Sequence, residues 1–187
     1  MQTFGKWLGR MLLALLVLAA LGVAGFWIFA PGIAGSRMNN VIAHDPYPVS
    51  PDAGALHATL VIGDWHADSL LWNRDLTERG SYGQVDLPRL REGNVAVQVF
   101  TAVTKSPAGQ NYEENSAEAF GQLWPVRTWT SILERALYQA EKLHGFAAAE
   151  PQHLQVVTTK AELNTVLARR TQGEPVVAGL LGIEGAH

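Results

Sequence analysis

The segment VIGDWHAD (residues 61–68) joins an apolar run to a histidine and an aspartate, and it decides how the rest of the chain is interpreted. Residues 59–62 are apolar or β-branched and too few for a helix, so they predict a short buried strand. Side chains alternate along a strand, so His66 and Asp68 are expected to point to the same side. An imidazole and a carboxylate that converge in this way are suitable ligands for a divalent cation.

Glu184 follows a second apolar run, residues 175–183, which also predicts a strand. Strands that are apolar on both faces and alternate with helices favour parallel βαβ units. The C-terminal ends of such strands carry the chemistry, so we expect Glu184 to join His66 and Asp68 there. Further strands are predicted at 94–101 and 154–157, and helices at 69–79, 86–93, 129–145 and 159–170.

The long helix at 129–145 is expected to bury one apolar face. This face consists of Trp129, Ile132, Leu133, Ala136, Leu137, Ala140 and Leu143. Gly145 is expected to end the helix.

Structural interpretations of the three polar residues remain open at this stage. A His-x-Asp pair is common by chance, and Asp64 or Asp68 is also suited to cap a following helix with His66 hydrogen-bonded beside it. Glu184 alone is equally compatible with a structural carboxylate near a glycine turn.

Composition narrows the classes of function. The formal net charge of −3 provides no basic surface of the kind that binds nucleic acid, so no nucleic-acid partner is expected. The chain has no cysteine, which excludes disulfides, thiolate zinc sites and a cysteine nucleophile. Any metal ion must therefore be held by histidine and carboxylate groups.

The N-terminus predicts a membrane anchor. No charged side chain occurs from Met11 to Ala34, and about 24 helical residues span roughly 36 Å, enough to cross a bilayer. Lys6 and Arg10 precede this run, so the start is expected in the cytoplasm and the rest outside. A cleaved signal peptide is the main alternative, because residues 23–25 (Val-Ala-Gly) resemble a cleavage site.

Three segments follow from this pattern. Residues 1–34 are expected to form a cytoplasmic start and transmembrane anchor. Residues 35–55 contain several prolines and predict a linker that lifts the folded part off the membrane surface. Residues 56–187 are expected to form the folded domain.

Four motifs together resemble the membrane dipeptidase (renal dipeptidase) family of zinc peptidases, from about Leu56 to the C-terminus. The Asp-x-His-x-Asp segment at 64–68 is similar to the family's first strand end, and Glu-Gly-Ala-His at 184–187 to its third. Residues 85–90 (VDLPRL) and 93–100 (GNVAVQVF) resemble the passage from the family's first helix to its second strand. Ala67 departs from the family's frequent Asn, and Ser69-Leu70 from the Leu-Pro of animal members, which affects substrate preference more than metal binding.

The resemblance implies the beginning of an incomplete (β/α)8 TIM-type barrel, about the first three β/α units, after the N-terminal transmembrane helix. It also implies two zinc ions (Zn2+), with His66 and Asp68 on one and Glu184 bridging both, that activate a water for attack on a dipeptide. The expected enzyme is a metallo-dipeptidase, single-pass in the inner (cytoplasmic) membrane, with its catalytic domain on the periplasmic side. The remaining ligands of the family come from later strands, so we expect this chain to be truncated and inactive alone.

The expected partners are a dipeptide substrate and the membrane, with a homodimer left open. Two other functions also remain open at this stage. One is a different metal-dependent barrel amidohydrolase, because fold and ligands do not fix the substrate. The other is a non-catalytic membrane-anchored module in which His66 and Asp68 are structural.

Overall fold

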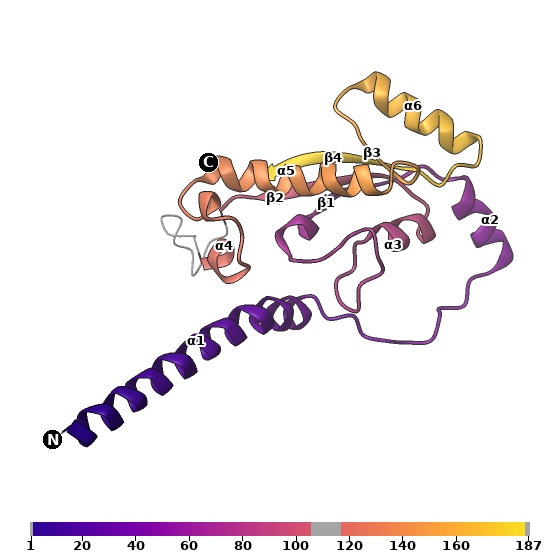
Figure 1. The fold of residues 1–187 in the computed structure, drawn as a ribbon. Helices are drawn as coiled ribbons and strands as arrows, with labels where there is room; N and C mark the ends of the chain where they lie inside the picture. Colours follow the sequence, from indigo (N-terminus) through magenta and orange to yellow (C-terminus); the bar gives the residue numbers. More distant parts are fainter. Residues whose placement is uncertain (1, 106–116, 186–187) are drawn as a thin grey trace.

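The computed structural model describes residues 2–105 and 117–185, and its centre is an all-parallel sheet (Figure 1). The strands lie in the order β1-β2-β4-β3. Their bounds are Ile62–Ala67 (β1), Val95–Val103 (β2), Leu154–Val156 (β3) and Val177–Glu184 (β4). The predicted α/β fold with parallel strands is thus confirmed. Consecutive strands are neighbours in a (β/α)8 barrel. Here β1, β2 and β4 are neighbours, and the short β3 lies outside β4, so the sheet by itself does not establish a barrel.

Helices and helical turns connect the strands. Two of them lie where the sequence predicts helices, and each has an N-terminal cap: Thr159 and Glu162 form a reciprocal capping box at one, and Asp86 caps the other. The elements are α1 (Gln2–Met38), α2 (Pro51–Thr59), η1 (Asp68–Leu71), α3 (Leu87–Glu92), α4 (Ala117–Gly121), η2 (Val126–Thr128), α5 (Ile132–Ala149) and α6 (Lys160–Thr171).

Two predictions for the segment before α3 are wrong. The first strand begins at Ile62, because residues 51–59 form α2, which Ser50 caps by accepting a hydrogen bond from Ala53 N. The helix expected at 69–79 is limited to the single turn η1. Beyond it, Asp75 Oδ1 accepts hydrogen bonds from Thr77 N (2.8 Å) and Thr77 Oγ1 (2.7 Å), and such local bonds compete with helix formation.

The fully buried Asp86 organises the segment between η1 and α3. Its carboxylate accepts hydrogen bonds from Gly80 N (3.2 Å) and Arg89 N (3.0 Å). It also pairs with the guanidinium groups of Arg74 and Arg89. A buried carboxylate is tolerated only where hydrogen bonds and opposite charges replace its hydration. Asp86 therefore fixes a long irregular segment in place of the predicted helix.

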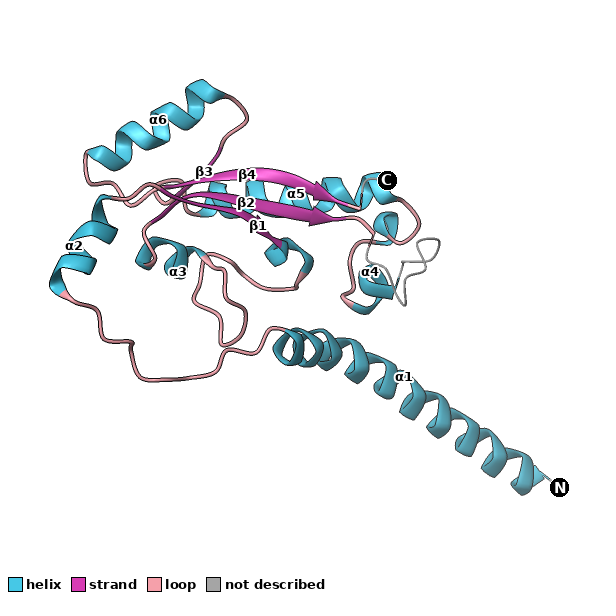
Figure 2. Cartoon of the chain, turned by 180° about the vertical axis from the view of Figure 1, so that it is seen from behind, coloured by secondary structure: helices cyan, strands magenta, loops and turns pink. Residues whose placement is uncertain are grey.

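The sheet separates two apolar clusters. Phe100 of β2 and Val177 of β4 pack on one face with Leu143 of α5. Their neighbours in sequence point the other way. On that side Val97 and Ala178 pack with the α6 face. Figure 2 shows α5 and α6 as separate layers on the sheet.

The buried face of α5 differs from the predicted one. Ile132, Leu133 and Leu137 are exposed, and the helix continues through Gly145 to Ala149. The buried residues of α5 are Arg135, Gln139 and Leu143.

Arg135, Gln139 and Lys142, which we call the polar ridge of α5, donate hydrogen bonds to backbone carbonyls. Gln139 Nε2 donates to Val103 O (2.8 Å), and its Oε1 accepts from Val103 N (3.1 Å). β1 pairs with β2 only as far as Phe100, so Gln139 takes the place of a strand partner beside Val103. Buried backbone groups must be paired, and this requirement draws polar residues rather than leucines to the sheet.

The helix α1 extends through Pro31 and beyond its expected end at Ala34. It is long and apolar enough to cross a membrane, a property that an N-terminal signal sequence shares. Its last turns contact the folded domain. Trp27 Nε1 donates to Phe120 O (3.1 Å), and Asn39 O, just after the helix, accepts from Gly83 N (2.7 Å).

Replacing Gln139 by leucine will destabilise the folded domain, because the Val103 N–H and C=O both lose their side-chain partner. Unsatisfied buried groups cost about 1–3 kcal/mol each, so we expect a loss of roughly 2–4 kcal/mol in the free energy of unfolding. Denaturation in detergent, followed by tryptophan fluorescence, measures it. Leu137→Gln on the exposed side of α5 is the control and should change stability by less than about 0.5 kcal/mol. Equal losses in the two variants would contradict this assignment.

Lys142 gives stability a specific pH dependence. Burial lowers the pKa of its ammonium group from 10.5 to about 8. Between these values the unfolded chain binds more protons than the folded one, so folding becomes more favourable as the pH rises. Relative to Lys142→Met, the wild-type free energy of unfolding should increase from pH 8 to pH 10.5, by up to about 3 kcal/mol. Denaturation curves of both proteins at several pH values test it, and a flat or falling difference would refute it.

Candidate metal centre

The three candidate ligands all lie at C-terminal strand ends. His66 is the second-to-last residue of β1, and Asp68 begins η1 directly after that strand. Glu184 is the last residue of β4. The strands are parallel, so these ends meet at one edge of the sheet, as the arrowheads in Figure 2 show.

The alternation of side chains places His66 and Glu184 on the same face. Ala67 pairs with Phe100, whose ring packs on the α5 side, so the preceding His66 points to the opposite side. Ala178 faces α6, and Glu184 lies six residues further along β4 on that same side. Gly182 lies on this side of β4 as well. Its lack of a side chain leaves room for Val99 of the neighbouring strand, because a Cβ there would lie 3.1 Å from Val99 Cγ1.

The structure brings all three predicted ligands together. His66 Nε2 lies 2.9 Å from Glu184 Oε2 and 3.1 Å from Asp68 Oδ1. One ligand atom from each residue falls within 4.8 Å of the other two. Their side chains are 57% (His66), 39% (Asp68) and 45% (Glu184) exposed, so solvent and small solutes reach them.

These distances fit a bound cation. Two ligand atoms about 2.0–2.1 Å from a tetrahedral zinc ion are separated by roughly 3.3 Å, close to the two observed spacings. His66 Nε2 carries at most one proton, so it cannot donate well to both carboxylates. Asp68 Oδ1 is buried, and among the described residues its neighbour is His66 Nε2, with no hydrogen bond assigned to it. A divalent cation would satisfy both oxygens at once.

Helix capping does not account for the two aspartates. The residue at the N-cap of η1 is Ala67, with no side-chain hydrogen bond, and Asp68 lies one position inside. Asp64 Oδ1 instead accepts a hydrogen bond from His66 N (3.2 Å), which fixes the backbone at the end of β1. Asp64 therefore positions His66.

Thr104, just after β2, holds the strand end that carries Glu184. Its N–H donates to Glu184 O (3.1 Å), and its Oγ1 lies 3.0 Å from both Glu184 O and Gly185 O. Gly185 has a φ of +76°, and a Cβ there would lie 2.7 Å from Lys105 O. Only glycine fits this turn without strain.

The polar ridge of α5 supports both halves of the site. Arg135 Nη1 donates to Thr104 O (3.0 Å), next to the contact that holds Glu184. Lys142 Nζ donates to Leu70 O and Trp72 O (2.7 Å each), at the end of the turn that Asp68 begins. One helix thus fixes the backbone near a ligand on each side of β2.

A polar crevice of about 270 Å³ adjoins His66 and Asp68. Its other walls include Asn39, Arg74 and residues 83–85. Arg74 Nη2 donates to Val85 O (3.1 Å), and desolvation lowers its pKa although Asp86 opposes the shift. The crevice gives a small polar molecule access to the candidate ligands.

Sequence reasoning missed the supporting residues. Arg135, Gln139 and Lys142 recur at i, i+4 and i+7, which places them on one helix face. A polar stripe on a helix usually faces solvent, and α5 also has an apolar stripe. Nothing in the sequence therefore indicated that the polar residues would be the ones facing the sheet. His187, the last residue of the Glu-Gly-Ala-His motif, lies outside the described residues.

Comparison with known families supports the motif-based interpretation. The family described as "Membrane dipeptidase (Peptidase family M19)" matches residues 51–187, which include β1, β2, β4 and all three candidate ligands. No curated protein matches the chain in a separate sequence comparison. The match covers well over half of the chain and begins at α2, so the chain belongs to the membrane dipeptidase family, peptidase family M19.

Proposed function

We propose that this protein is a membrane-anchored, zinc-dependent dipeptidase whose first metal ion is held by His66, Asp68 and Glu184. Membership of the family makes it a peptidase-type hydrolase. The observation that carries the proposal is the convergence of one imidazole and two carboxylates at neighbouring strand ends. The neighbours β1, β2 and β4 match three successive strands of a (β/α)8 barrel, the fold we propose for the domain.

Each ligand has a distinct role in this proposal. His66 would supply an imidazole nitrogen, and Asp68 a carboxylate oxygen to which no hydrogen bond is assigned among the described residues. Glu184 would contribute a second carboxylate, whose oxygens are suitable metal ligands. Zinc bound here would supply Lewis acidity and lower the pKa of a water molecule to near neutrality.

The chain's own residues would then bind and orient the substrate. A dipeptide placed in the crevice lies beside His66 and Asp68, and Asn39 and Arg74 offer polar groups in its walls. Lys6 and Arg10 lie in the first turns of α1, before its uncharged run, which favours a cytoplasmic N-terminus and a catalytic domain on the periplasmic side of the inner membrane.

Zinc binding to the purified chain in detergent tests the site directly. The wild-type chain should bind zinc through the three ligands. Glu184→Gln and His66→Ala should each weaken binding by at least about tenfold, because each removes one donor or its charge. Titration calorimetry after chelator treatment measures the affinity. Glu174→Gln, an exposed carboxylate paired with Arg169 before β4, is the matched control and should bind as wild type. Unchanged affinity in the ligand variants would show that the three residues are structural.

Hydrolysis by the full-length gene product in membranes tests the activity. Dipeptides should be cleaved, a zinc chelator should stop the reaction, and Glu184→Gln should lower kcat by roughly two orders of magnitude or more. Amino-acid release measures the rate. If cyclic amides are hydrolysed and dipeptides are not, the protein is another metal-dependent amidohydrolase.

A further inference from the structure

Three large apolar side chains are exposed on the short segment that contains α4 and η2. Phe120 is 39% exposed, Leu123 51% and Val126 73%. We call these three residues the α4–η2 patch. Clustered apolar side chains on a surface usually mark a contact with a protein, a ligand or a membrane.

Leu123 has a left-handed backbone, with φ of +53°. Its N–H donates to Phe120 O (3.1 Å) and Trp124 N donates to Ala119 O (2.9 Å), an arrangement that ends α4. Glycine or asparagine usually occupies such a position, and another residue costs about 1 kcal/mol or more. The chain adopts this costly conformation at a leucine whose side chain is exposed, so Leu123 adds to the apolar surface of the patch.

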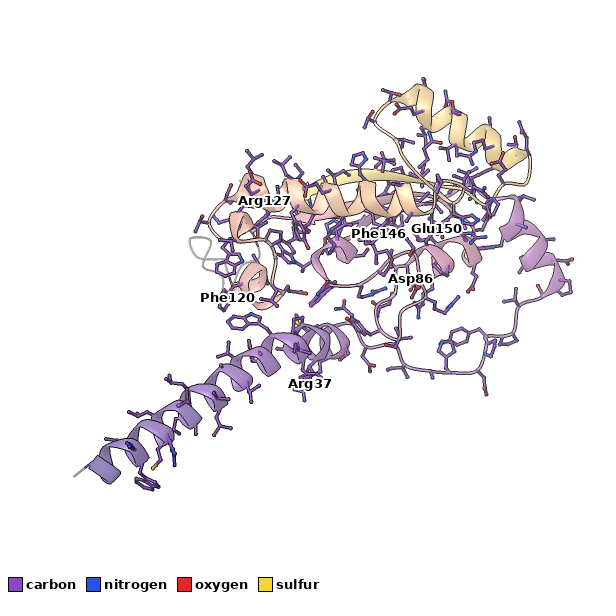
Figure 3. The ribbon with its side chains drawn as sticks, viewed as in Figure 1. Arg37, Asp86, Phe120, Arg127, Phe146 and Glu150 are labelled. Carbon is purple, nitrogen blue, oxygen red and sulfur yellow. The ribbon has the colours of Figure 1, made fainter. Side chains whose placement is uncertain are left out.

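The patch adjoins the apolar helix α1. Phe120 lies over α1 in Figure 3 and forms an edge-to-face contact with Trp27, with ring centroids 4.9 Å apart. On its other side Phe120 contacts Trp129, also at 4.9 Å. The three rings continue the apolar surface of α1 directly onto the folded domain.

Trp27 marks the level at which α1 leaves a bilayer. The uncharged run begins at Met11, and about 20 helical residues cross the hydrocarbon layer, so α1 would leave it near Ala30. Tryptophan favours that interface. Because Phe120 contacts Trp27, this residue of the patch would lie at the same depth.

We propose that the α4–η2 patch rests in the interfacial layer of the membrane, so that the domain lies directly on the lipid rather than being held away from it by a linker. This inference rests on the proposed role of α1 as an uncleaved membrane span. The occupant of the patch is the boundary between lipid headgroups and acyl chains.

Charged groups nearby limit the depth. Glu118 lines an apolar crevice of about 350 Å³ between α1 and the domain. Arg127, beside Val126, pairs with Glu134 and Glu141. These charges require water or headgroups, because charges in the hydrocarbon layer are costly. The patch is therefore inserted at headgroup level, and the domain above it stays in water.

Single-cysteine labelling tests the inference, because the chain has no native cysteine. Leu123→Cys and Val126→Cys would each carry an environment-sensitive fluorophore in the whole protein, reconstituted in phosphatidylcholine vesicles. Leu18→Cys, in the middle of α1, reports whether α1 spans the bilayer, and Asn164→Cys, exposed on α6, is the water-facing control. Val126 is exposed enough that a label there should not disturb folding.

Quenching by lipids that carry a nitroxide at the headgroup or in mid-chain gives the depth. Labels at positions 123 and 126 should lose fluorescence with headgroup-level nitroxide, position 18 with mid-chain nitroxide, and position 164 with neither. Quenching at 18 without quenching at 123 and 126 overturns the inference and leaves the anchor intact. No quenching at 18 overturns the membrane span and the inference with it.

Discussion

The structure depends on the hydrogen bonds made by the backbone of the central strand β2 where it extends beyond the end of β1. Parallel strands of unequal length leave N–H and C=O groups without a partner, and in a buried position each must be paired. Gln139 pairs with Val103, and Arg135 with Thr104. These side chains replace the missing strand partner, so β2 can extend past the end of β1. Thr104, just after β2, then donates a hydrogen bond to Glu184 O at the end of β4. The α5 contacts are thus a condition for the site, although no α5 residue is a ligand.

The same reasoning explains why the three candidate ligands are half-exposed while the groups that support them are buried or half-buried. A metal ligand needs access to solute, and a half-exposed side chain has many rotamers. Burial and hydrogen bonding of the adjacent backbone reduce that freedom. Asp64 restrains the backbone at His66, Lys142 the turn of Asp68, and Thr104 the end of β4. Such support of ligand positions by neighbouring groups is typical of metal sites.

The sequence allowed the parallel strands and the three convergent residues to be predicted, because strand alternation and strand-end geometry are local rules. Glu184 could be predicted because it ends an apolar run. The segment 69–79 was different: its leucines predict a helix, and the buried Asp86, with partners that approach from several positions, overrides that preference. The orientation of α5 is set by the carbonyls of Val103 and Thr104, which accept hydrogen bonds from its side chains. No pattern within the helix sequence indicates these distant acceptors. Hydrogen bonds between polar groups that are far apart in the sequence therefore cannot be predicted from local periodicity.

Contacts of the Asp86-fixed segment also connect the crevice to the end of α1. Gly83 N donates to Asn39 O, and Gln84 Nε2 donates to Asn40 O (3.1 Å). Tyr82 packs so closely on Gly35 that a Cβ there would meet its ring at 2.9 Å. Residues 83–85 form one wall of the crevice beside His66, and Asn39 forms another. The helix that would cross the membrane and the opening of the candidate site are therefore connected by the same hydrogen-bonded segment. An apolar helix with a fixed attachment of this kind sets the direction in which the site faces, whereas a flexible linker would leave it free to turn.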